Sequence, residues 1–197
     1  MPYFIKHAKY LHDALLIYGG EMTFSTEPWL VTEDLMRLGV PAALLINEKG
    51  KTLLERIKAG NIKIGPNVFV GRQVYIEDDA EVRYSDLEKY TRIGEGAVLG
   101  HVYLSPYSEI GPCSSLSECA LGLQVRVDSS KKSPTHINGG SVLGPEINVL
   151  KGTRLNNVQI SPGFKFAREG LPYKNEILEP TDDQIKTITD KYRIPRK

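Results

Sequence analysis

An aliphatic residue returns at about every sixth position between Ile64 and Ile160, and the positions between are mostly polar, small or glycine. These recurring residues are Ile64, Val70, Ile76, Val82, Ile93, Leu99, Leu104, Ile110, Leu116, Ile137, Leu143, Val149 and Leu155. Four positions after most of them stands a small or β-branched residue, for example Ala97, Ser108 or Ala120. Glycine often follows the aliphatic residue directly, which suits a sharp backbone turn. A short fixed period is typical of a solenoid.

Each six-residue unit is expected to form one short strand and one tight turn, and three units are expected to form a triangular coil. The aliphatic residue would point inward and stack on its equivalent in the next coil. A period of six cannot keep one face of a helix at about 3.6 residues per turn, so a helical interpretation fails. We therefore predict a mainly β fold, a single-stranded left-handed parallel β-helix of hexapeptide repeats. Its left-handed coiling is an exception to the usual right-handed crossover.

The periodic stretch divides the chain into three predicted parts. Residues 1–60 lack the period and contain helical patterns, including an amphipathic one over 51–58, so we expect a helical cap on the first coil. Residues 61–163 are expected to form the β-helix, with an excursion loop over the polar segment 128–136. Residues 164–197 are expected to form a tail with a short helix that has Thr181 as its N-cap.

The repeat shortens to five residues at two places, from Val82 to Leu87 and from Leu99 to Leu104. Such steps are tolerated at the corners of a solenoid. Together with the interruption over 128–136, they bracket His101. These irregular corners are therefore where we expect function.

Composition narrows the classes of partner. The chain has 25 Lys and Arg against 24 Asp and Glu among 197 residues, so neither nucleic acid nor an anionic membrane is favoured as a partner. No apolar run approaches the roughly 20 residues that span a bilayer. The first twenty residues lack the apolar core and cleavage site of a signal peptide, so we expect a cytoplasmic protein. Cys113 and Cys119, expected at equivalent turn positions, are then free thiols.

Two segments are similar to motifs of a known enzyme family. Residues 88–111, EKYTRIGEGAVLGHVYLSPYSEIG, are similar to its lysine-to-histidine stretch. Glu27-Pro28-Trp29 is similar to its Pro-Trp linker. On these residues the chain resembles, over roughly 28–162, the C-terminal acetyltransferase domain of the bacterial bifunctional N-acetylglucosamine-1-phosphate uridyltransferases. It also resembles the matching domain of archaeal sugar-1-phosphate nucleotidyltransferases.

The resemblance implies a homotrimer in which acetyl-CoA, or another acyl-CoA, meets a sugar phosphate or nucleotide sugar between adjacent subunits, with no metal required. The family's general base maps onto His101, and the lysine that holds the sugar-phosphate end maps onto Lys89. The excursion-loop lysine maps onto Lys132, and a family arginine maps onto Arg72 if one residue of slippage is allowed. The residues themselves add Tyr103, which is close to His101 in sequence and could stack on a base or sugar.

Some positions depart from the family's pattern, and they leave an alternative open. Arg126-Val127 stand where the family has an Asn-Tyr pair, and Ser117–Ala120 stand where it has a GAGT-like run. The alternative is a non-catalytic trimeric β-helix: a scaffold, a regulatory subunit or a nucleotide-sugar binder. His101 would then be a surface or interface histidine, and the basic residues solvated charge. A three-histidine zinc site is not expected, because only His101 and His136 fall within the β-helix.

Overall fold

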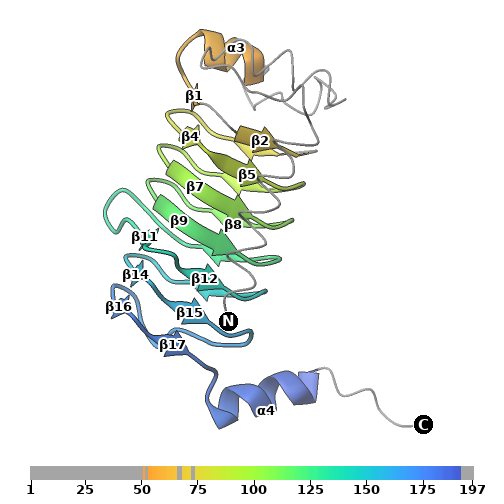
Figure 1. The fold of residues 1–197 in the computed structure, drawn as a ribbon, viewed down its shortest axis with the longest axis vertical. Coiled ribbons are helices and arrows are strands. Elements are labelled where there is room, and N and C mark those ends of the chain that lie inside the picture. The colour runs from red at the N-terminus through yellow and green to blue at the C-terminus, as the bar shows by residue number, and fades with distance from the viewer. Residues whose placement is uncertain (1–50, 52, 66–67, 72–73, 192–197) are drawn as a thin grey trace, which may run out of the picture.

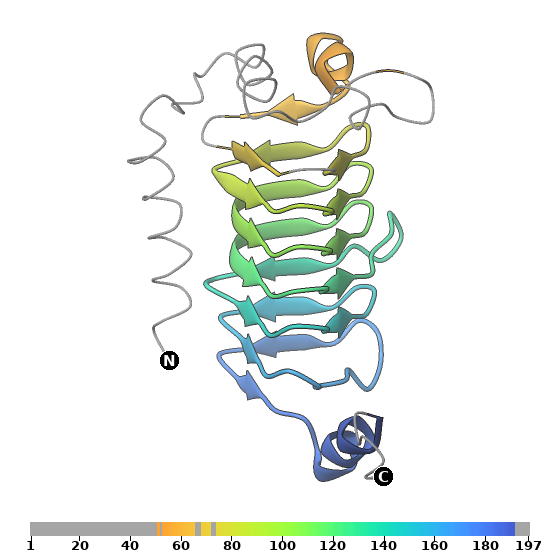
Figure 2. The same cartoon turned by 90° about the vertical axis from the view of Figure 1, so that its right-hand side faces the viewer.

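The chain folds into a three-sided solenoid of short parallel strands, seen from two sides in Figures 1 and 2. This computed structural model describes residues 51, 53–65, 68–71 and 74–191. Along the first face of the described part, seven strands stack in succession, so the solenoid has about seven coils. The predicted left-handed parallel β-helix is confirmed.

Each face of the solenoid is one column of strands. The first face consists of β1 (Lys63–Ile64), β4 (Glu81–Arg83), the first halves of β7 (Val98–Leu104) and β9 (Ser115–Leu121), β11 (His136–Asn138), β14 (Arg154–Asn156) and β16 (Pro172–Lys174). The second face consists of β2 (Val68–Val70), β5 (Ser85–Leu87), the second halves of β7 and β9, β12 (Val142–Leu143), β15 (Gln159–Ile160) and β17 (Ile177–Leu178). The third face consists of β3 (Tyr75–Ile76), β6 (Arg92–Ile93), β8 (Glu109–Ile110), β10 (Arg126–Val127) and β13 (Asn148–Val149). Val82 pairs with Leu99, and Leu99 with Leu116, so these coils take 17 residues each.

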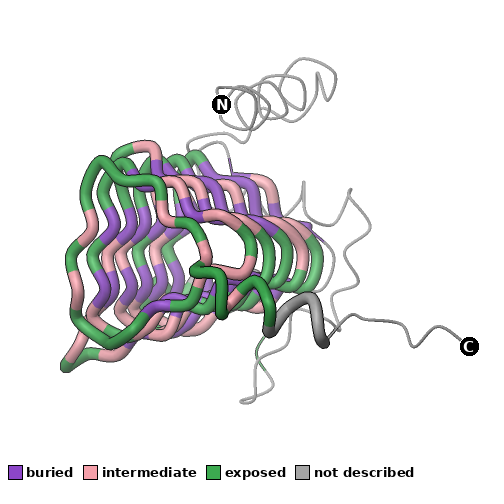
Figure 3. Tube along the Cα trace, turned by 90° about the horizontal axis from the view of Figure 1, so that it is seen from below, coloured by how far each residue is buried: buried purple, intermediate pink, exposed green. Residues whose placement is uncertain are grey.

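The interior is the stack of recurring aliphatic residues. All of those named in the sequence are at most 3% exposed, which confirms their predicted inward direction. Figure 3 shows buried and exposed positions alternating along every strand around this interior. Burying one such side chain contributes roughly 1.5–3 kcal/mol, so the stack is the main source of stability.

Each corner is turned by residues with positive φ. The first corner, between the first and second faces, carries Tyr84 (48°), His101 (57°), Glu118 (50°), Asn157 (52°) and Asn175 (55°). The second corner, between the second and third faces, carries Tyr90, Tyr107, Gln124 and Glu146. The third corner, between the third and first faces, carries Asp79, Gly96, Cys113, Gly152 and Gly170. We call the five first-corner residues the first-corner ladder.

The first corner explains the five-residue steps. One left-handed residue turns it, so the inward residues on either side are five apart, as Leu116 and Leu121 also are. Where two glycines, Gly139 and Gly140, turn this corner, the step returns to six. The short steps are thus a regular property of this corner, and our interpretation of them as irregularities is wrong.

The short corner also moves one interior position. Cys119, three residues after Leu116, packs in the core, whereas Ala120 pairs with Tyr103 on the outward side of the second face. The prediction of Ala120 as an interior residue is therefore wrong. The two cysteines are free thiols, as predicted, but they are not equivalent: Cys113 turns the third corner, and Cys119 is buried. Burial raises the pKa of the Cys119 thiol.

Helices stand at both ends of the described solenoid. Helix α3 (Leu53–Lys58) lies within the range expected to be helical, and its Arg56 reaches Asp78 of the first coil. Helix α4 (Asp182–Lys191) begins with a capping box. The backbone N–H of Gln184 donates to Thr181 Oγ1, and the N–H of Thr181 donates to Gln184 Oε1. The helices expected near 7–18 and 32–38 lie outside the described residues. None of the described helices is long and apolar enough to cross a bilayer.

Paired strands continue past residue 163, where the repeat was expected to end. Strands β16 and β17 pair in parallel with β14 and β15. The repeat is not visible there because aromatic residues replace aliphatic ones. Phe166 packs edge-on against Phe164 and Tyr173, at ring-centroid distances of 5.1 and 5.5 Å.

Candidate functional site

The predicted site residues lie on different corners of one chain. His101 is in the middle of β7 at the first corner, and Lys89 directly precedes Tyr90 at the second corner. Lys132 belongs to the segment between β10 and β11, at the third corner. Arg72 lies outside the described residues. The three described residues therefore do not form one site within a single chain.

His101 is exposed and held by the geometry of its corner. Arg83 pairs with Gly100, which places the next residues, Tyr84 and His101, one above the other. Both have positive φ, so their side chains leave the backbone in the same direction. The two rings stack with centroids 4.7 Å apart and an interplanar angle of 3°. Tyr84 is absent from our sequence prediction, although its place 17 residues before His101 was a usable signal.

The nitrogen atoms of His101 are open. Within the described part of the chain, Tyr84 is the imidazole's ring contact, and no hydrogen bond or ion pair engages its nitrogens. Glu118 follows on the next rung of the first-corner ladder but forms no hydrogen bond with His101 among the described residues. Side chains on successive rungs can meet, because Asn157 Nδ2 donates to Asn175 Oδ1 at 2.9 Å. The imidazole is thus free to bind a ligand or a group from another subunit.

Tyr103 lies around the corner from His101. It faces outward on the second face, where it pairs with Asp86 and Ala120, and it is half-buried. Burial, and then the nearby charges of Glu88 and Asp86, raise the pKa of its phenol. The hydroxyl is therefore a hydrogen-bond donor at neutral pH, and the ring offers little open face.

Lys89 is exposed at the second corner beside a second aromatic stack. The rings of Tyr90 and Tyr107 lie 4.9 Å apart at an interplanar angle of 6°. The carbonyl of Lys89 accepts a hydrogen bond from the N–H of Tyr107, which fixes its backbone. The ammonium group forms no ion pair with the described residues, so it can bind an anion.

The segment between β10 and β11 displays two lysines at its tip. Ser130 and Ser133 form an antiparallel bridge, and Lys131 and Lys132 between them are exposed. Figure 2 shows the segment projecting from the edge of the solenoid.

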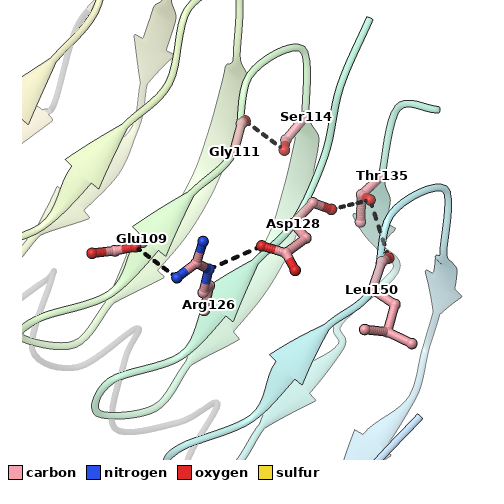
Figure 4. A network of polar contacts seen from close by, with 7 residues as sticks. All are labelled: Glu109, Gly111, Ser114, Arg126, Asp128, Thr135 and Leu150. Atoms are coloured by element: carbon pink, nitrogen blue, oxygen red, sulfur yellow. Dashed lines mark hydrogen bonds and ion pairs between the residues drawn. The ribbon is translucent and has the colours of Figure 1, made fainter. Parts of the chain in front are cut away.

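The buried Thr135 anchors the base of this segment. Its Oγ1 donates to Asp128 O at 2.7 Å and accepts from the N–H of Gly152 at 3.0 Å (Figure 4 shows the first bond). A rigid base therefore carries a doubly cationic tip.

A groove of about 360 Å³ runs along the third face, beside this segment. The charged residues that line it alternate in sign: Glu77, Arg92, Glu109, Arg126, Asp128 and Lys151. Arg126 Nε donates to Asp128 Oδ1 at 2.9 Å, and its Nη1 lies 3.8 Å from Glu109 Oε2 (Figure 4). The hydrogen bond with Asp128 raises the pKa of Arg126. This alternation was visible in the sequence, where Arg92, Glu109 and Arg126 are 17 residues apart.

The described residues bring no three His, Cys, Asp or Glu side chains together around a possible metal position. His136 lies in β11 on the first face, in a later coil than His101. The two histidines therefore belong to separate parts of the surface.

Comparison with known proteins gives partial and distant matches. No family model matches the chain. It is 29% identical over 109 residues to a probable mannose-1-phosphate guanyltransferase of Schizosaccharomyces pombe. The match covers 55% of this chain and 26% of that enzyme, so the chain spans about a quarter of its relative's length. The likeness to sugar-1-phosphate nucleotidyltransferases expected from the sequence is confirmed.

Similar solved structures include the acetyltransferase domain of PglB from Neisseria gonorrhoeae FA1090, with 14% identity, a TM-score of 0.35 and 62% of each chain covered. The same domain in complex with acetyl coenzyme A has 16% identity and a TM-score of 0.35, over 61% of this chain and 55% of that one. A mutant of perosamine N-acetyltransferase from Caulobacter crescentus, in complex with CoA and GDP-perosamine, has 19% identity and a TM-score of 0.24, over 60% and 50%. These distant likenesses carry no argument about the activity of this chain.

Proposed function

We propose that this chain is an acyl-CoA-dependent acyltransferase, with acetyl as the expected acyl group, that modifies an amino or hydroxyl group of a sugar phosphate or nucleotide sugar. The observation that carries the proposal is the state of His101. It is exposed, its corner and its stack with Tyr84 restrain it, and no described residue occupies its nitrogens. The 29% identity with a mannose-1-phosphate guanyltransferase supports a sugar-phosphate acceptor.

In this mechanism His101 is the general base. A neutral imidazole can accept a proton near pH 7, which is the task that an amine or hydroxyl nucleophile sets. As His101 takes the proton, the acceptor attacks the thioester carbonyl and forms a tetrahedral oxyanion. Backbone N–H groups stabilise that oxyanion, as is usual in acyl transfer. Collapse breaks the C–S bond, and the leaving CoA thiolate takes the proton from the imidazolium.

The cations of the proposed site come from more than one subunit. Because His101, Lys89 and Lys132 lie on three corners, a homotrimer with parallel solenoid axes would bring corners of neighbouring chains together. Lys89 and Lys132 would then neutralise phosphate groups, and Arg72 would join them. The imidazole supplies the base, so the reaction requires no metal ion.

The test is release of the free CoA thiol from acetyl-CoA in the presence of amino-sugar phosphates and nucleotide sugars. We expect turnover with at least one acceptor, and we expect His101→Ala to lower kcat by about 10²- to 10⁴-fold. His136→Ala is the matched control, because it removes an imidazole from another coil of the first face, and it should retain activity. Absence of turnover with every acceptor, or full activity in His101→Ala, would refute the proposal.

One observation favours the alternative, a trimeric module that binds a nucleotide sugar without turnover. Val127 is buried in the core, and Arg126 is engaged by Asp128, so neither can replace the polar pair that stands there in the resembling family. Calorimetric titration with nucleotide sugars separates the two functions. The module would bind them in the presence of acetyl-CoA without any release of thiol.

A further inference from the structure

We infer that Tyr84 is a positioning residue for His101, which it holds by stacking in the orientation needed to accept a proton. The inference rests on the proposed function, because it gives Tyr84 a part in the same reaction. It concerns a residue one coil away from the proposed base that need not touch either substrate.

The stack follows directly from the solenoid geometry. Strands in neighbouring coils lie about 4.8 Å apart, which is close to the preferred separation of stacked rings. The observed 4.7 Å between the rings of Tyr84 and His101 therefore requires no distortion of either coil. Both residues turn the same corner with similar φ, 48° and 57°, so the rings meet face to face.

A catalytic imidazole needs restraint, and stacking supplies it without using a nitrogen atom. Histidines that act in catalysis or metal binding are often oriented by a hydrogen bond from one ring nitrogen to a carboxylate or carbonyl. No such bond reaches His101 from the described residues. The lone pair of an imidazole lies in the plane of the ring, whereas Tyr84 contacts the ring face. Both nitrogens are thus left for the acceptor and for a second group, while the ring plane is restrained.

Stacking could also serve the stability of the corner alone, and the molecule contains a matched control for that role. Tyr90 and Tyr107 form a similar stack at the second corner, at 4.9 Å and 6°, also with positive φ. Tyr107→Leu removes a stacked, exposed tyrosine from a corner without touching His101. Comparison with Tyr84→Leu therefore separates loss of a corner stack from loss of restraint on the imidazole.

The first experiment needs no substrate. In protein labelled at histidine, the ring protons of His101 should resonate upfield in the wild type because of the ring current of Tyr84. This shift should persist in Tyr84→Phe and Tyr107→Leu and disappear in Tyr84→Leu. If the resonances are the same in Tyr84→Leu and the wild type, the stack does not exist in solution and the inference is overturned.

The second experiment measures acetyl transfer to an acceptor identified by thiol release. We expect Tyr84→Leu to lower kcat by about 10- to 100-fold, with KM for acetyl-CoA unchanged, because the base is misplaced and substrate binding is intact. Tyr84→Phe should restore kcat, and Tyr107→Leu should retain it. Equal losses in Tyr84→Leu and Tyr107→Leu, or no loss in Tyr84→Leu, would overturn the inference. An active His101→Ala would instead remove the proposed function, and the positioning role with it, even if the resonance shift remained.

Discussion

Left-handed backbone conformation at His101 is not in itself a sign of function. A non-glycine residue in this conformation costs roughly 1–2 kcal/mol, and such strain is frequent at active sites. Here, however, residues as different as Tyr84, Glu118 and Asn157 adopt it at the same corner. The conformation is a requirement of the corner. What distinguishes His101 is its open imidazole and the tyrosine stacked on it.

Small polar residues in the interior differ in whether their hydroxyls are satisfied. The Oγ1 atoms of Thr91 and Thr153 are buried and have no hydrogen-bond partner in the described part of the chain, whereas Thr135 Oγ1 makes several hydrogen bonds. Thr91→Val should therefore leave stability unchanged or raise it by up to about 1 kcal/mol, because no hydrogen bond is lost. Thr135→Val should lower it by about 1–3 kcal/mol, because Asp128 O and the N–H of Gly152 lose their partner.

Urea denaturation followed by circular dichroism measures both free energies of unfolding. The two substitutions remove the same atom from the same residue type, so each is the control for the other. Equal destabilisation by both would contradict this account of the interior.

Among the elements, α3 is fixed to the first coil by one buried cation. Arg56 is 2% exposed, and its Nη2 and Nε lie 2.7 and 2.8 Å from Asp78 Oδ1. Arg56→Met should lower the free energy of unfolding by about 1–3 kcal/mol, since it removes charge-assisted hydrogen bonds from a buried position. Arg83 is a control of the same type, because it is exposed and lies 3.8 Å from Glu81.

Arg83→Met should change stability by no more than about 0.5 kcal/mol. Hydrogen exchange can locate the effect of Arg56→Met, which should accelerate exchange first in β1 and β4. If both arginine variants were equally stable, α3 would not be anchored by this ion pair.

The strands and their interior were predictable because one simple rule, an inward aliphatic residue in every unit, covers most of the solenoid. The corners were not, because left-handed turns accept Tyr, His, Glu and Asn alike and leave no common residue type in the sequence. This is why Cys119 was placed at a turn and Ala120 inside. It is also why Tyr84 was missed as the neighbour of His101.

The candidate site was predictable only as a set of residue types. Resemblance identified His101, Lys89 and Lys132, but their distribution over three corners depends on where the five-residue steps fall. Arg126 could not be assigned its ion pair with Asp128, because that contact depends on the direction in which the chain leaves β10.

At the scale of the whole molecule, separate corners predict assembly. Sedimentation equilibrium should give a mass close to three times the 22.0 kDa of one chain. A sharper test mixes two inactive chains, His101→Ala and Lys132→Ala, by co-expression. Mixed trimers should recover part of the activity that neither variant has alone, because one of their sites has both residues intact. A stable 22.0 kDa monomer, or no recovery in the mixture, would argue against a site between subunits.

The 17-residue register turns the solenoid into a ruler along its axis. His101 and the projecting Lys131-Lys132 tip are separated by a whole number of coils, so their axial distance depends on coil number rather than on side-chain packing. A copy of residues 82–98 inserted after residue 115 would keep every inward position matched. It would move the lysine tip about 4.8 Å farther from the histidine. The length of ligand that spans the two could therefore be changed in steps of one coil.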